Sequence, residues 1–111
     1  MKAQNYLLVN QEYEVKVDKV ANLLKSLSTR ELFLLAQVYC GLDFPHTSIV
    51  LKDAMAFLRC SKMTARRVLN DLVSKELLVY VGDFTSFYYP VKDQGNIIRA
   101  RLFVELGVCK L

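Results

Sequence analysis

The sequence has few of the residues from which catalytic and metal sites are usually built. It contains one histidine, His46, and three cysteines, Cys40, Cys60 and Cys109, which are widely spaced and form no C-x-x-C pair. A zinc site needs about four nitrogen or sulfur ligands, and a catalytic triad needs a histidine beside its nucleophile. The four glycines are isolated from one another, so no glycine-rich phosphate loop exists. We therefore expect no enzyme activity, no metal and no cofactor.

Long apolar runs are also missing. The run at 32–36 is five residues long, whereas a helix that crosses a bilayer needs about 20. The N-terminal segment becomes polar again at 10–12, so we expect no signal peptide. Unpaired cysteines are typical of a reducing compartment, where they act as small apolar side chains. These absences favour a soluble cytoplasmic protein with no membrane partner.

The apolar residues that are present suffice for one compact domain. The chain has 111 residues, of which 53% are hydrophobic, and only two prolines. A chain of this length buries roughly 65% of the surface that its unfolded form exposes, enough for a core without disulfides. We therefore expect a single domain over residues 1–111.

Positive charge is concentrated in one short stretch. The net charge is +4, and no acidic residue lies between Asp53 and Asp71. Four basic residues lie in this interval: Arg59, Lys62, Arg66 and Arg67. Without them, eleven basic and eleven acidic residues remain, so the rest of the chain is neutral. A confined basic excess is typical of a surface that binds an anionic partner, although a solvated helix face is the alternative.

The first half of the chain changes its periodicity. Residues 12–18 alternate between polar and apolar, which predicts a half-buried strand, and residues 18–27 then follow helical spacing. Ser28-Thr29-Arg30-Glu31 matches a capping box at the start of a buried helix that ends at Gly41. Residues 43–46 have the composition of a turn, and residues 47–50 that of a short β segment.

Two amphipathic helices follow, joined by a short turn. The first covers 51–58, and after the break at 59–61 Ser61 is placed to cap the second. From Lys62 onward, apolar residues follow the i, i+3, i+4, i+7, i+8 rule: Ala65, Val68, Leu69, Leu72 and Val73. The opposite face carries polar and basic residues: Lys62, Met63, Arg66, Arg67, Asn70 and Ser74. This is the arrangement of a helix-turn-helix, whose second helix enters the DNA major groove.

The next segment predicts a β-hairpin. Residues 77–81 and 87–91 are rich in aromatic and β-branched side chains, and residues 82–86 have turn composition. We expect its aromatic residues to pack on the helices rather than to stack on single-stranded nucleic acid, because no basic residue is interleaved with them: Tyr80, Phe84, Phe87, Tyr88 and Tyr89. A helix-turn-helix followed by a hairpin is a winged helix.

Residues 50–72 and their continuation 73–78 resemble the DNA-binding core of winged helix-turn-helix regulators of the MarR and ArsR type. With the helix from Ser28 and the hairpin, the resemblance covers residues 28–91. It implies an α+β, mostly helical fold: a three-helix core plus a β-hairpin wing, with an N-terminal extension (1–27) and a C-terminal extension (92–111).

The resemblance also implies which side chains contact DNA. Lys62, Met63, Arg66 and Arg67 occupy positions that face the major groove, where arginine bonds guanine and methionine packs on a thymine methyl. Asn70 would contact adenine or a phosphate, and Ser61 and Thr64 a phosphate, Thr64 having a helix-start role as its alternative. Arg59 and Lys52 would clamp phosphates. The whole expected set is Lys52, Arg59, Ser61, Lys62, Met63, Thr64, Arg66, Arg67 and Asn70.

Three features depart from the family pattern. Arg59 and Glu76 stand where the family usually has glycine, and a non-glycine residue with positive φ is uncommon. Met55 occupies a place that often holds a small residue. The wing tip at 83–86 contains no lysine or arginine, so we do not expect it to enter the minor groove.

The ends of the chain bear on assembly. Residues 98–106 alternate like a strand but contain good helix formers, and the pattern leaves both structures open. A patch of four charges is small for tight binding by one copy, so we expect a homodimer built from 1–27, 93–111 or both. A two-fold dimer would place its recognition helices about 34 Å apart.

The expected function is sequence-specific binding of double-stranded DNA by a small transcriptional regulator. The sequence identifies no small-molecule effector. Two alternatives stay open: a plasmid or phage replication or partition protein that binds DNA, and a winged-helix module that docks another protein.

Overall fold

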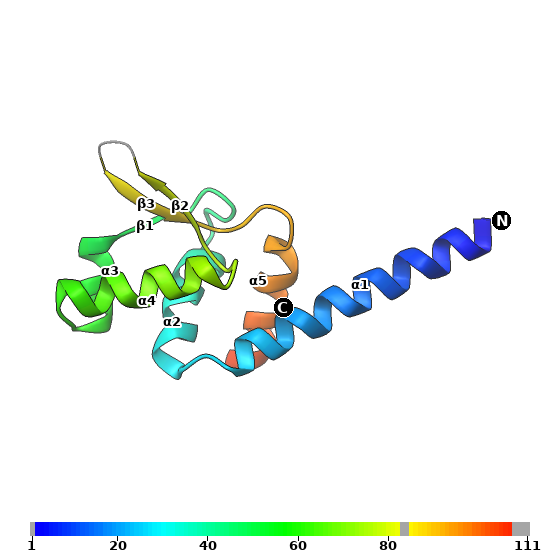
Figure 1. Ribbon diagram of the computed structural model, residues 1–111, viewed down its shortest axis with the longest axis horizontal. Helices are drawn as coiled ribbons and strands as arrows, with labels where there is room; N and C mark the ends of the chain where they lie inside the picture. The colour runs from blue at the N-terminus through cyan, green and yellow to red at the C-terminus, as the bar shows by residue number, and fades with distance from the viewer. Residues whose placement is uncertain (1, 83–84, 108–111) are drawn as a thin grey trace.

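The computed structural model describes residues 2–82 and 85–107, with side chains from residue 14 onward. Its described residues form helices and strands in this order: α1 (Lys2–Lys25), α2 (Thr29–Tyr39), β1 (Ile49–Val50), α3 (Leu51–Leu58), α4 (Lys62–Ser74), β2 (Val79–Gly82), β3 (Ser86–Tyr89) and α5 (Gly95–Leu106). Figure 1 shows α2, α3 and α4 together beneath a hairpin, with α5 and the long α1 at the other end. The mostly helical α+β winged helix predicted from the sequence is confirmed.

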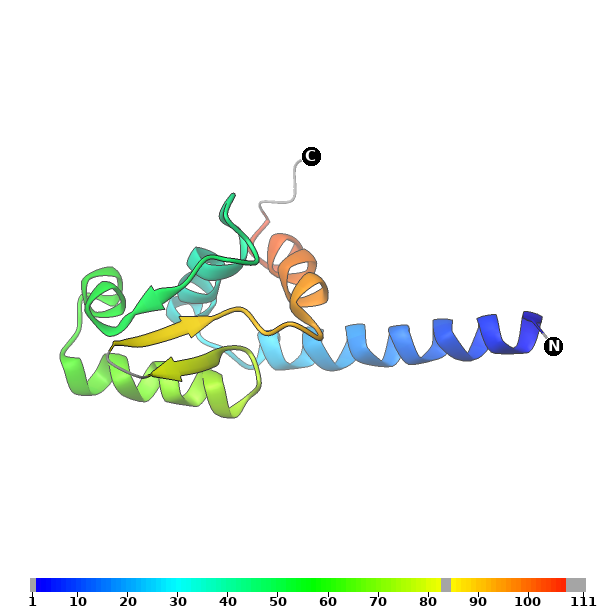
Figure 2. The ribbon, with the colours of Figure 1, turned by 90° about the horizontal axis from the view of Figure 1, so that it is seen from above.

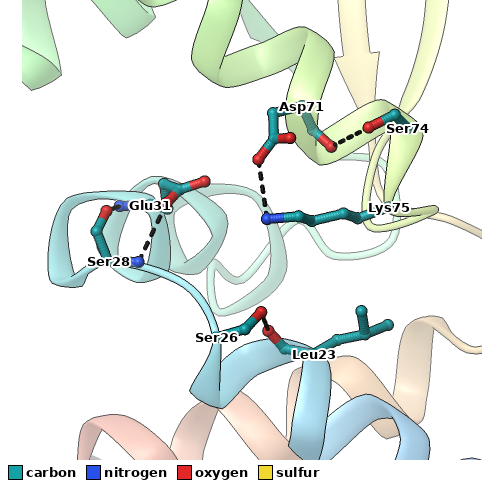
Figure 3. A network of polar contacts seen from close by, with 7 residues as sticks. All are labelled: Leu23, Ser26, Ser28, Glu31, Asp71, Ser74 and Lys75. Carbon is teal, nitrogen blue, oxygen red and sulfur yellow. Dashed lines mark hydrogen bonds and ion pairs between the residues drawn. The ribbon is translucent and has the colours of Figure 1, made fainter.

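The capping box begins α2 as predicted. The Ser28 hydroxyl accepts a hydrogen bond from the Glu31 amide at 3.2 Å, and the Glu31 carboxylate accepts one from the Ser28 amide at 3.1 Å (Figure 3). Leu34, Leu35, Val38 and Tyr39 are buried, because α2 packs against both α3 and α5. α2 is therefore the central helix of the fold.

The sheet is antiparallel, with strand order β1-β3-β2. The predicted β segment at 47–50 is confirmed as β1, where Ile49 is paired with Tyr88 of the hairpin. Tyr88 is only 4% exposed and packs into the core, as expected. The expectation is wrong for Tyr80, which is 49% exposed because it lies on edge strand β2. Phe87 and Tyr89 are half-buried, and Phe84 lies outside the described residues.

The predicted strand at 12–18 is wrong, because these residues belong to the single helix α1. Their alternation does not correspond to two faces of a sheet: Val15 is 66% exposed, and the buried residues nearby, Val20 and Leu24, follow helical spacing. The open question at 98–106 is resolved in favour of helix, since α5 covers 95–106 and buries Ile98 and Leu102. Helix is favoured there because α5 packs between α1 and α2.

The molecule is elongated, with extents of 55 × 32 × 25 Å. Only the C-terminal part of α1 packs against α5, whereas its N-terminal half extends away from the rest of the chain (Figures 1 and 2). Within the described residues, no helix is long and apolar enough to span a membrane. Cys40 and Cys60 are half-buried free thiols, less buried than expected, and Cys109 lies outside the described part.

Tyr39 at the end of α2 joins the hairpin to the helices. Its hydroxyl donates to the Leu77 carbonyl at 2.7 Å and accepts from the Val91 amide at 2.9 Å, so it holds both ends of the hairpin. Its own carbonyl accepts from Arg99 Nε of α5 at 2.9 Å. Burial raises the pKa of Tyr39 to about 12, although the hydrogen bond from Val91 acts in the opposite direction. One residue thus connects α2, the wing and α5, through its hydroxyl and its own carbonyl.

Candidate nucleic-acid interface

The turn between α3 and α4 has a defined backbone geometry. Arg59 adopts the left-handed conformation (φ 53°, ψ 53°), and the Cys60 amide donates to the Met55 carbonyl at 3.2 Å. This bond, from one residue past the left-handed position back to the last turn, belongs to the Schellman motif that commonly ends helices. The position therefore has the conformation for which glycine is favoured, although arginine occupies it.

Arg30 of α2 fixes the same turn from outside. Its Nη2 donates to the carbonyl of Leu58, the last residue of α3, at 2.5 Å. Helix ends leave their last carbonyls without intrahelical partners, so this bond satisfies one of them. The sequence pattern did not reveal this role, because Arg30 lies within the capping box and its partner is 28 residues further along the chain.

A second left-handed residue ends α4. Glu76 has φ 60°, its amide donates to the Val73 carbonyl at 3.0 Å, and the Leu77 amide donates to the Leu72 carbonyl at 2.9 Å. Leu72 and Leu77 are both buried, which supplies the hydrophobic contact that accompanies this motif. Both places where the family usually has glycine are therefore left-handed in this chain too.

The N-terminus of α4 is capped as predicted. The Ser61 hydroxyl accepts from the Thr64 amide at 3.2 Å and donates to the Thr64 hydroxyl oxygen at 3.1 Å. Thr64 therefore has a structural contact at the helix start, and the proton of its own hydroxyl is still available to a ligand. No acidic residue lies in the first turn of α4, so the positive end of its dipole is not neutralised there.

The outer face of α4 carries the predicted residues. Ala65, Leu69 and Leu72 are fully buried on the inner side. The outward residues are all exposed: Lys62, Met63, Arg66, Arg67, Asn70 and Ser74. Met63 has 75% of its surface exposed. A shallow depression runs along this face, lined by Met63, Arg66, Arg67, Asn70, Asp71 and Ser74.

The positive charge on this surface is not balanced by nearby acids. Asp71, the acidic residue of α4, is paired with Lys75 at 2.9 Å (Figure 3). Among the side chains that the structure describes, the one other ion pair joins Arg101 to Glu105 on α5 at 2.8 Å. None of the expected basic contact residues is therefore in an ion pair within this part of the chain: Lys52, Arg59, Lys62, Arg66 and Arg67.

Lys52 and Arg59 flank this face rather than belonging to it. Lys52 is exposed on α3 and Arg59 is exposed in the turn, and neither lines the depression on α4. The helix-turn-helix nevertheless joins all nine expected contact residues in one unit, because α3 packs directly on α4. Residues 14–82 and 85–107 contain no cluster of three or more His, Cys, Asp or Glu side chains that could hold a metal.

Comparison with known proteins finds likeness in structure alone. No protein-family model and no curated protein sequence matches this chain. Among solved structures, the DNA complex of Staphylococcus aureus MepR, a transcription regulator of the multidrug efflux pump MepA, is similar with a TM-score of 0.59 at 14% identity, over 94% of this chain and 86% of that one. A MarR-family transcriptional regulator from Rhodococcus sp. RHA1 gives 0.56 at 14% identity, over 97% and 79%.

A third similar structure is that of BpsR from Bordetella bronchiseptica, from work on the regulation of its DNA binding by 6-hydroxynicotinic acid. It has a TM-score of 0.55 at 15% identity, over 91% of this chain and 71% of that one. The chain thus shares the winged-helix fold of MarR-type regulators along nearly its whole length. This confirms the fold that the sequence resemblance implied.

Proposed function

We propose that this protein binds double-stranded DNA through the outer face of α4 and acts as a small transcriptional regulator. The observation that carries the proposal is the basic excess on a helix-turn-helix: five exposed cations without ion-pair partners in the described residues, against two acids, Asp53 and the paired Asp71. Such cations can neutralise DNA phosphates without first breaking an ion pair within the protein, and the counterions that the DNA then releases favour binding. The MepR–DNA complex, which has the same fold, supports the same conclusion.

Each element would contribute a different kind of contact. α4 would lie in the major groove, where Arg66 and Arg67 bond guanine and Met63 packs on a thymine methyl. The capped start of α4, with Ser61 and Thr64, would meet a phosphate, which the helix dipole favours. Lys52 and Arg59 would bind phosphates on either side, which fixes the position of α4 without reading bases.

We further propose that two copies act together as a homodimer through residues 1–27, 93–111 or both. The N-terminal half of α1 extends from the body (Figure 2), and an isolated helix gains little stability without packing. Val15 on α1 and Val104 on α5 are both largely exposed. Covering these residues with a second copy would bury apolar surface and present two α4 helices to one duplex.

The proposal is tested by selecting a preferred sequence from random duplexes and titrating salt on it. The logarithm of the affinity should fall with the logarithm of salt concentration with a slope of about −0.9 per neutralised phosphate, or about −4 to −8 for a dimer. Arg66→Ala or Arg67→Ala should each cost about 1 to 3 kcal/mol and relax one base position. Lys92→Ala, which removes an exposed charge outside α4 and outside residues 1–27 and 93–111, is the matched control and should leave affinity nearly unchanged.

Two results would contradict the proposal. One is a selection that enriches no sequence, together with binding that does not respond to salt. The other is an equal effect of the arginine substitutions and of Lys92→Ala, because the face of α4 would then have no special role. Enriched sequences without a two-fold repeat would argue against the homodimer alone.

A further inference from the structure

The wing carries a cluster of hydroxyl groups on the face of the sheet where Tyr88 is buried. Tyr80 and Tyr88 are paired across β2 and β3, with ring centroids 5.3 Å apart. The Tyr80 hydroxyl lies 2.9 Å from the Ser86 hydroxyl. Tyr80 extends across Gly82 so closely that a Cβ at this position would lie 2.2 Å from the tyrosine oxygen. Tyr80 is thus exposed, yet held in one place by three neighbours.

Two hydroxyls bonded to each other always have a free proton. Each hydroxyl carries one proton, and the mutual bond uses only one of the two. Whichever group donates, the other can still donate to an anion that approaches from solvent. A donor that is held before binding loses less conformational freedom when it binds. The Tyr80–Ser86 pair is therefore suited to a phosphate oxygen.

The hairpin places this pair beside the helix that carries the cationic face. Figures 1 and 2 show the hairpin next to α4. The pKa of Tyr88, the cross-strand partner of Tyr80, is raised by burial and by Tyr80 and lowered by the positive charge of Arg66. The wing tip at 83–86 contains no lysine or arginine, so a contact of these residues with DNA would use a neutral donor.

We propose that Tyr80, together with Ser86, forms a binding site for a DNA backbone phosphate at the edge of the major groove. The site rests on the proposed function and extends it to the wing. It takes the phosphodiester through a neutral hydrogen-bond donor. The wing thus contributes to affinity through hydroxyl groups rather than through cations.

The test compares Tyr80→Phe with Tyr89→Phe by fluorescence anisotropy on the selected duplex. Tyr89 is the matched control, because it lies on the opposite face of the same hairpin, where Val79 is its cross-strand partner. Tyr80→Phe should weaken binding about 5- to 10-fold, which corresponds to one lost hydrogen bond, and Tyr89→Phe should not. The salt slope should stay unchanged in Tyr80→Phe and become shallower in Arg59→Ala, because the proposed phosphate contact of Arg59 is cationic whereas that of Tyr80 is neutral.

A scan of single methylphosphonates along the duplex identifies the partner. At one position per half-site, removal of the phosphate charge should weaken the native protein but not Tyr80→Phe. Equal sensitivity of both proteins at every position would overturn the site, since the hydroxyl would then only support the hairpin. Native affinity in Tyr80→Phe, with weakened binding in Arg66→Ala, would also overturn it and leave the proposed function intact. Loss of DNA binding by the native protein itself would count against the proposed function instead.

Discussion

Arg59 and Glu76 are both left-handed residues with side chains, and both end helices of the helix-turn-helix. A left-handed conformation costs an L-residue roughly 1 to 2 kcal/mol. Glycine avoids that cost but loses more freedom on folding, roughly 0.5 to 1 kcal/mol. Glycine at either position would therefore make the protein slightly more stable.

Glycine substitutions at Arg59 and Glu76 should have the same effect on stability but different effects on DNA binding. Arg59→Gly and Glu76→Gly should each raise the free energy of unfolding by up to about 1 kcal/mol, measured by urea denaturation. Arg59→Gly should also weaken DNA binding and make the salt slope shallower by about 0.9 per copy. Glu76→Gly should not weaken binding. Equal affinities in the two variants would show that Arg59 makes no phosphate contact.

Tyr39 makes the free energy of unfolding depend on pH in the alkaline range. Because the pKa of the folded protein's Tyr39 is about 12 and that of an unfolded tyrosine is about 10, the unfolded chain releases its proton first as pH rises. Stability is complete below pH 10 and falls between pH 10 and 12, by about 2 to 3 kcal/mol in all.

Tyr39→Phe isolates this effect from other titrating groups. At neutral pH the variant should be less stable by about 1 to 3 kcal/mol, because the Val91 amide and the Leu77 carbonyl lose their partner. The difference from the native protein should shrink as pH rises from 9 to 11, since phenylalanine has no proton to lose. Urea denaturation at stepped pH measures it, and a constant difference would contradict the assignment.

At the scale of the element, the cap of α4 has two roles that can be separated. Ser61→Ala should lower stability by about 1 kcal/mol through loss of the cap. Ser61→Asp should keep the cap and near-native stability, since aspartate is as good an N-cap. It should nevertheless weaken DNA binding more than alanine does, because its charge repels the phosphate. Thermal unfolding and anisotropy on the same samples give both readouts. Tight binding by Ser61→Asp would place the phosphate elsewhere.

The elements that the sequence predicted correctly are those with local signals. The Ser28 and Ser61 caps, the apolar spacing of α4 and the composition of the hairpin all lie within a few residues of the structure they determine. The strand predicted at 12–18 is wrong because no local signal distinguishes the two structures there. Over so short a stretch, the same apolar residues fit both a period of two residues and helical spacing. Only the packing of α1 on α5 decides between them.

The site was predictable to the same extent. The outward face of α4 follows from its periodicity, but Arg30 and Tyr39 act on partners 28 to 52 residues away. The sequence predicts that Tyr80 packs on the helices, because no basic residue is interleaved with the aromatic residues of the hairpin. Its exposure depends on β2 being the edge strand, which the order of the sheet determines and the sequence does not reveal.

At the scale of the whole molecule, the terminal helices are expected to set the oligomeric state. Val104→Glu on α5 should convert a dimer to a monomer, because a buried unpaired charge is costly whereas the exposed side chain of a single copy is not. Val81→Glu, at a similarly exposed apolar residue of the wing, is the control for mass. Light scattering at tens of micromolar measures the mass of the native protein and of both variants. A monomeric mass for the native protein would contradict the homodimer.

The bonds of Arg30 and Tyr39 have a mechanical consequence. Arg30, near the start of α2, binds the end of α3, and Tyr39, at the end of α2, binds both ends of the hairpin. α2 therefore fixes the relative positions of the parts that would contact a duplex. None of these parts can tilt independently without breaking a bond to α2. A stimulus that changes DNA affinity would therefore move α2, the α3–α4 turn and the hairpin together. The change would be measured as a different distance between the two copies rather than as greater loop mobility.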